Sequence, residues 1–85
     1  MGKLSKEDII LKNKIAERIK FFRLKTGLSQ SEFAQKFEID RQILSRWESK
    51  NNSRGVTVYT IQKFCSMIGI TLNEFFDFEW FGYNL

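Results

Sequence analysis

The stretch that decides the fold is SQSEFAQKFEIDRQILSRWES, residues 29–49. Apolar side chains recur in it at helical spacing in two short runs, Phe33, Ala34 and Phe37 and then Ile43, Leu44 and Trp47. Ser29 lies three residues before Glu32, the spacing of a capping box, so the first run is expected to form a helix beginning at Gln30. Asp40 is a good N-cap for a second helix. The stretch therefore predicts two short helices joined by about three residues, each with an apolar inner face.

Upstream of this pair, the sequence predicts one longer amphipathic helix from about Lys6 to Lys25. Four apolar residues recur along it at helical spacing: Leu11, Ile15, Ile19 and Phe22. Lysines, Glu17 and Arg18 occupy its other faces. Gly27, after Thr26, supplies the stop, because glycine adopts the left-handed conformation that closes a helix at little steric cost.

Downstream of the pair, an exposed loop and two further helices are expected. The loop is the polar, turn-rich run SKNNSRG, residues 49–55. Thr57 caps a fourth helix, which Gly69 closes. The apolar residues of this helix are Val58, Ile61, Phe64, Cys65 and Ile68. Thr71 and Glu74 again have capping-box spacing and predict the start of a fifth helix.

Together these elements predict an all-α fold of five helices in one domain, residues 1–85, with the central helix pair at about residues 29–49. A chain of 85 residues has little room for a second core, which also favours one domain. The β-branched run VTVY, residues 56–59, also fits a strand. A single strand without a partner is a poor element, so the helical interpretation is preferred.

The composition excludes several classes of function. The chain has 14 Lys and Arg against 10 Asp and Glu, and this formal net charge of +4 favours contact with polyanions or acidic surfaces. One cysteine and no histidine exclude an intrachain disulfide and a histidine-based metal or acid/base site. No nucleophile-base pair or phosphate-cradling glycine loop is visible, so we expect no catalytic residues, no metal, no cofactor and no enzyme activity. A charged N-terminus and the lack of an apolar run of about 20 residues predict a cytoplasmic protein without membrane contact.

Residues 15–76 resemble the lambda-repressor-like family of helix-turn-helix domains, the Cro/C1 or xenobiotic-response-element type. The features that carry the resemblance are Gly27-Leu28-Ser29-Gln30, Phe33-Ala34, Ile39, Leu44-Ser45-Arg46-Trp47-Glu48 and Gly69-Ile70-Thr71-Leu72. The resemblance implies a helix-turn-helix at helices two and three. It also implies a sequence-specific transcriptional regulator, a repressor that binds a palindromic operator as a homodimer. The sequence departs from the family at Glu38, where a glycine is usual, and in the loop before helix four, which lacks the usual proline.

The resemblance makes the helix after Asp40 a recognition helix, which presents its outward side chains to base edges in the major groove of double-stranded DNA. The candidates for base contacts are Arg41, Gln42, Ser45 and Arg46. Arginine can donate two hydrogen bonds to guanine, and glutamine can both donate to and accept from adenine, so Arg41 and Gln42 rank first. A solvated polar face without DNA contacts is the alternative.

Further polar residues are candidates for contacts to DNA phosphates. Gln30 starts helix two, where similar repressors bring a glutamine and the helix dipole to a phosphate. The candidates for a second phosphate clamp, on the loop, are Ser49, Lys50, Asn51, Asn52 and Arg54. Polar loops also occur without any such role. The positions of Arg23 and Glu48 match a charge pair that ties helix one to the end of helix three in similar repressors, so the resemblance implies a structural salt bridge there.

The C-terminal tail, residues 77–85, is acidic and rich in aromatic residues. A domain this small cannot easily bury all of its aromatic side chains, and exposed aromatic patches usually mean a partner. We therefore expect helix five and the tail to form a dimer or partner interface. Its candidate residues are Phe76, Phe78, Trp80, Phe81 and Tyr83. Folding of the tail back over helix one is the alternative.

Three kinds of regulator share this length and fold, and the sequence does not separate them. They are a phage-type repressor, a controller of restriction-modification genes and the antitoxin of a toxin-antitoxin pair. The expected partners are double-stranded DNA and a second copy of the chain, with a protein effector or a toxin as a further candidate. An interaction module that binds another protein through the aromatic C-terminus is the second class of function. Steep weakening of binding with salt discriminates the two classes, because phosphate contacts require it.

Overall fold

The computed structural model describes residues 4–51 and 55–77 of the chain, and these residues fold into helices joined by short turns. The helices are α1 (Lys6–Lys25), α2 (Gln30–Phe37), α3 (Arg41–Trp47), α4 (Val58–Ile68) and α5 (Leu72–Phe75). No strand occurs in the described residues, and the run at residues 56–59 leads into α4. The expected all-α fold of five helices is therefore confirmed.

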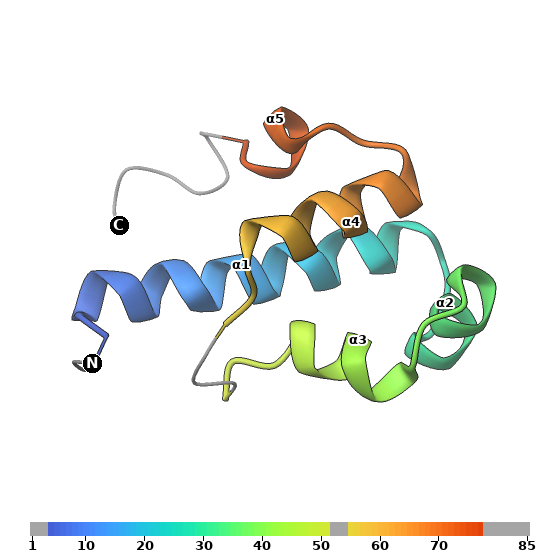
Figure 1. Ribbon diagram of the computed structural model, residues 1–85, viewed down its shortest axis with the longest axis horizontal. Helices are drawn as coiled ribbons and strands as arrows, with labels where there is room; N and C mark the ends of the chain where they lie inside the picture. The colour runs from blue at the N-terminus through green and yellow to red at the C-terminus, as the bar shows by residue number, and fades with distance from the viewer. Residues whose placement is uncertain (1–3, 52–54, 78–85) are drawn as a thin grey trace.

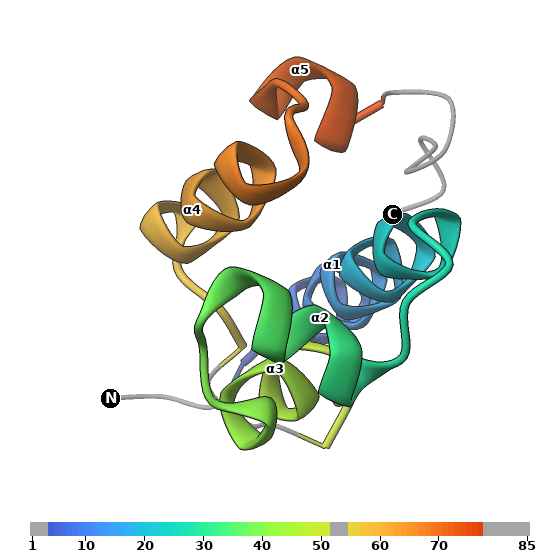
Figure 2. The same ribbon diagram turned by 90° about the vertical axis from the view of Figure 1, so that its right-hand side faces the viewer.

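The longest helix, α1, runs along most of the length of the molecule (Figure 1). In Figure 1, α5 lies above α1 and the angled pair of α2 and α3 lies below its C-terminal part, and Figure 2 shows α4 between α5 and this pair. The N-terminal part of α1 extends beyond the other helices (Figure 1). The other helices therefore lie beside the C-terminal part of α1.

Every helix contributes to one hydrophobic core. Its buried members are Ile19, Phe33, Leu44, Ile61, Phe64, Cys65 and Phe75. The centre of the Phe64 ring on α4 lies 5.8 Å from the ring centre of Phe33, 6.2 Å from that of Phe75 and 6.5 Å from that of Trp47. Full burial of a phenylalanine stabilises a fold by about 1.5–3 kcal/mol. Phe64 therefore joins α2, α3 and α5 to α4.

The helix starts follow the caps expected from the sequence. Ser29 Oγ accepts a hydrogen bond from the backbone N–H of Glu32 at 3.1 Å, and Glu32 Oε1 accepts one from the backbone N–H of Ser29 at 2.8 Å. Two more capping boxes are Thr71 with Glu74 and Ser5 with Asp8. The box at the start of α1 was not among the expectations, although the serine and the aspartate have the required spacing.

Three apolar residues expected on inner faces are instead exposed: Leu11 by 38%, Ile43 by 39% and Val58 by 55%. Leu11 lies in the N-terminal half of α1, where it lines an open hollow of about 230 Å³ that also includes Gly55 and Val56. Helical spacing identifies which residues share a face of a helix, but it does not tell which part of that face meets a neighbour. The expectation for these three side chains was therefore wrong.

Arg18 departs from expectation in the opposite direction. It was assigned to an outer face of α1, but only 5% of it is exposed. Its Nε donates to the carbonyl oxygen of Phe75 at 2.8 Å, and its Nη2 donates to that of Glu74 at 2.9 Å. These carbonyls lie at the end of α5, where a helix leaves its last oxygens without internal partners. Burial lowers the pKa of Arg18, and the charge of Asp77 opposes that shift. Arg18 therefore caps α5 from α1.

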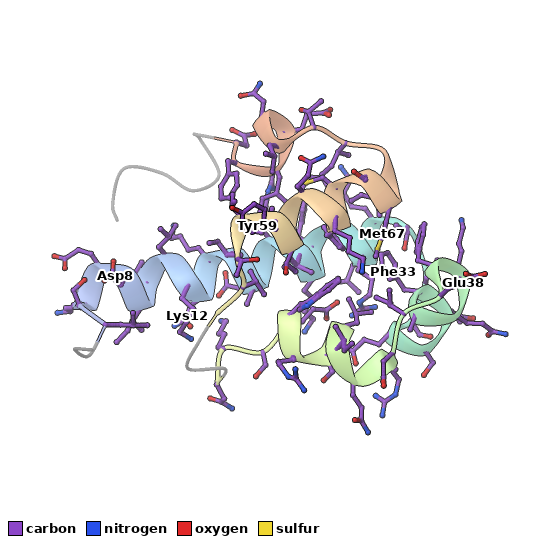
Figure 3. The ribbon with its side chains drawn as sticks, in the orientation of Figure 1. Asp8, Lys12, Phe33, Glu38, Tyr59 and Met67 are labelled. Atoms are coloured by element: carbon purple, nitrogen blue, oxygen red, sulfur yellow. The ribbon has the colours of Figure 1, made fainter. Side chains whose placement is uncertain are left out.

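The turn between α2 and α3 contains a strained residue, Glu38, which lies at its outer edge (Figure 3). Glu38 has φ 58° and ψ 45°, the left-handed conformation that favours glycine. We expect Glu38→Gly to raise the free energy of unfolding by about 1 kcal/mol, because relief of this strain exceeds the extra entropy of glycine in the unfolded chain. Urea denaturation followed by circular dichroism measures the change. Glu38→Ala is the control, since it removes the charge but keeps the Cβ atom. A Glu38→Gly protein less stable than wild type would contradict the expectation.

Candidate DNA interface

The first turn of α3 presents most of the expected base-contacting side chains to solvent. Asp40 caps this helix, with its Oδ1 accepting a hydrogen bond from the backbone N–H of Gln42 at 2.8 Å. Arg41, Gln42 and Arg46 are exposed, and Ser45 is half-buried. Leu44 is fully buried and fixes the orientation of the helix against the core. Some side chains of α3 project away from α4 (Figure 3), whereas the ring of Trp47 packs against that of Phe64 on α4. The structure thus brings the four candidates onto one short helix.

Ile43 is a residue of this surface that sequence reasoning assigned to the interior. Its side chain follows Gln42 in the first turn of α3, and the residue is 39% exposed. An aliphatic side chain in this position can contact the methyl group of thymine. The sequence did contain a sign that Ile43 is exposed: the helix is short, and Leu44 and Trp47 already define its inner face.

A network of hydrogen bonds connects α1 with the end of α3 and the start of α2. Arg23 Nε donates to Glu48 Oε2 at 2.6 Å, and Arg23 Nη2 donates to Glu48 Oε1 at 3.2 Å. The side chains of this pair are only 8% and 4% exposed. Arg23 Nη1 also donates to the carbonyl oxygen of Leu28 at 2.8 Å. The structural salt bridge implied by the resemblance is therefore present, buried and bidentate.

Gln30 belongs to the same network, which sequence reasoning did not anticipate. Its Nε2 donates to Glu48 Oε1 at 3.0 Å, so the side chain is held between α2 and the end of α3. A side-chain amide carries two N–H donors, and the second can donate to a phosphate. Glu48 thereby orients a candidate phosphate contact as well as pairing with Arg23.

The loop after α3 turns its first cation toward α1. Lys50 Nζ forms an ion pair with Glu17 Oε2, and the carbonyl oxygen of Lys50 accepts a hydrogen bond from Lys12 Nζ at 2.8 Å. Lys12 projects from α1 (Figure 3). Ser49 Oγ accepts a hydrogen bond from the backbone N–H of Asn51 at 3.1 Å. The other two loop candidates, Asn52 and Arg54, lie outside the described residues. Neither Lys12 nor Glu17 was singled out as a partner of the loop by sequence reasoning.

Comparison with known proteins identifies the family. The family profile described as Helix-turn-helix matches residues 19–75, which is more than half of the chain. The chain belongs to the Cro/C1-type helix-turn-helix family. Control protein C.MunI of a Mycoplasma species is 40% identical to it over 53 residues, which make up 62% of this chain and 69% of that protein. No solved structure matches it significantly.

Membership in this family confirms the resemblance seen in the sequence and the expected class of function. This helix-turn-helix protein is a DNA-binding transcriptional regulator. Within the described residues, no helix is long and apolar enough to cross a membrane.

The one cysteine, Cys65, is fully buried in the core of the helix-turn-helix domain, and burial raises the pKa of its thiol. Cys65 therefore packs as a small apolar residue of the core.

The described part of the C-terminal candidate interface of the helix-turn-helix protein is small. Phe76 is half-buried and packs against the core, with its ring 5.0 Å from that of Phe75. The remaining candidates, Phe78, Trp80, Phe81 and Tyr83, lie outside the described residues. Phe75 is fully buried, so the first aromatic residue of this region completes the core.

Proposed function

We propose that this regulator represses transcription by binding a palindromic operator as a homodimer. The observation that carries the proposal is the exposed first turn of α3, with Arg41 and Gln42 on a helix anchored by buried Leu44. A helix of this kind fits the major groove, where its N-terminal side chains reach base edges. Ser45 and Arg46 extend the same surface by one turn.

Contacts to the DNA backbone fix the position of α3 in the groove. Gln30, held by Glu48 at the start of α2, supplies one such contact. The loop after α3 supplies the others in this proposal, through Ser49, Lys50, Asn51, Asn52 and Arg54. Their loss weakens binding to all sequences about equally, whereas loss of a base contact changes sequence preference.

Dimerisation through α5 and the tail, residues 77–85, gives the operator its palindromic form in this proposal. Two-fold symmetry of a protein dimer is mirrored by two inverted half-sites in DNA. The supporting observations are the half-burial of Phe76 and the number of aromatic residues that follow it. Sedimentation that finds only monomer at high micromolar concentration would contradict this arrangement.

The similarity to a control protein supports one of the three kinds of regulator that the sequence left open, a controller of restriction-modification genes. The alternative class, a module that binds another protein, predicts little dependence on salt. We expect a steep decrease of DNA affinity between about 50 and 200 mM salt, because each neutralised phosphate releases counterions.

Selection from random duplex DNA tests the proposal. Wild-type protein is expected to enrich a palindrome. Arg41→Ala and Gln42→Ala are each expected to lose about 5- to 150-fold of the discrimination at one position of each half-site, the range for a bidentate base contact. Gln62→Ala, an exposed change on α4, is the control and retains the wild-type preference. Absence of enrichment with the wild-type protein would overturn the proposal and favour the protein-binding module.

A further inference from the structure

Lys50 is the third residue after the recognition helix, and the structure holds both its backbone and its side chain against α1. Its ammonium pairs with the Glu17 carboxylate, and its carbonyl oxygen accepts the hydrogen bond from Lys12. We propose that Glu17 competes with DNA for Lys50. In the free protein, the Glu17 carboxylate pairs with the Lys50 ammonium, which binds a backbone phosphate when the protein is on DNA. This inference rests on the proposed function, which assigns Lys50 to a phosphate.

The exposure of this ion pair allows exchange. The side chains of Lys50 and Glu17 are 54% and 46% exposed, in contrast to the buried pair of Arg23 and Glu48. An exposed ion pair shifts an equilibrium by at most about fivefold, so a phosphate can displace the carboxylate. The displaced Glu17 then lies near the same phosphate and repels it. Both effects lower the affinity for DNA.

Lys12 contacts both described ends of the loop during this exchange. Its Nζ binds the carbonyl oxygen of Lys50 at the start of the loop. Its stem lies against Gly55 at the other end, where an added Cβ would come 3.1 Å from Lys12 Cγ. Both described ends of the loop therefore rest on one side chain of α1. Release of Lys50 from Glu17 then requires a rotation of the Lys50 side chain, with its backbone still held.

A double-mutant cycle tests the inference. The proteins are wild type, Glu17→Gln, Lys50→Gln and the double variant, and the probe is a fluorescein-labelled DNA duplex of random sequence measured by anisotropy. We expect Glu17→Gln to bind about three- to fivefold more tightly at low salt, since Lys50 is released to the DNA. The gain should be clearly smaller when Lys50 is glutamine, because only the repulsion between Glu17 and the DNA then remains to be removed.

The outcomes separate the inference from the function on which it rests. An equal gain in both backgrounds would mean that Glu17 only repels DNA through space, and it would overturn the competitor role while leaving DNA binding intact. No gain from Glu17→Gln would overturn it as well. Failure of all four proteins to bind the duplex would overturn the proposed DNA interface together with this inference. Glu7→Gln, an exposed acidic residue of the same helix, is the control and should bind like wild type.

Discussion

Replacement of Glu48 by alanine is expected to lower the free energy of unfolding by about 3–5 kcal/mol. The change removes the acceptor of three hydrogen bonds, two from Arg23 and one from Gln30. Arg23, which is 7% exposed, would then keep its charge in the interior without a counter-ion. The cost of an unpaired buried charge greatly exceeds the worth of an exposed ion pair, which is about 0–1 kcal/mol.

Thermal and urea denaturation measure this loss, with a decrease in Tm of more than about 10 °C expected for a domain of this size. The matched control is the double variant Arg23→Met with Glu48→Met. Because it removes both charges, it should be much more stable than Glu48→Ala. A loss below about 1 kcal/mol for Glu48→Ala would show that the pair behaves as a surface contact.

Replacement of Arg18 by methionine is expected to lower the free energy of unfolding by about 2–4 kcal/mol. Methionine keeps an apolar stem of similar length but donates nothing to the carbonyl oxygens of Glu74 and Phe75. It also removes the cation that lies 4.5 Å from the centre of the Phe22 ring. The loss should be local to the contact between α1 and α5.

Native-state hydrogen exchange distinguishes this local effect from general destabilisation. We expect the amides of α4 and α5 to exchange faster in Arg18→Met, with a smaller change in α2 and α3. Lys20→Met, an exposed substitution on the same helix, is the control and should exchange like wild type. Equal protection of α5 in both variants would contradict a capping role for Arg18.

The local signals in the sequence predicted the elements of the fold well. Ser29, Asp40, Thr57 and Thr71 each cap the helix that was expected to follow them. This success has a physical cause, because a cap involves atoms within about three residues of one another and depends little on the rest of the molecule. Gly69 closes α4 with φ 76° for the same reason.

The candidate interface was predicted in part. The spacing after Asp40 placed Arg41 and Gln42 outward, where the structure has them exposed. The same spacing placed Ile43 inward, because periodicity cannot tell which of two adjacent positions at the edge of a face is covered. The contact roles of all these residues remain predictions for the DNA-binding experiments above.

The sequence by itself determined the helices, their caps and the family, since these depend on neighbouring residues and on an ordered motif. Only the tertiary structure decided the partners of long polar side chains. Arg18 and Glu74 are separated by 56 residues, and Lys12 and Lys50 by 38. Such pairs depend on where helices far apart in the sequence come together, and no local pattern records that. A flexible charged side chain on a predicted outer face was therefore free to become either a buried cap, as in Arg18, or the exposed partner of a loop, as in Glu17.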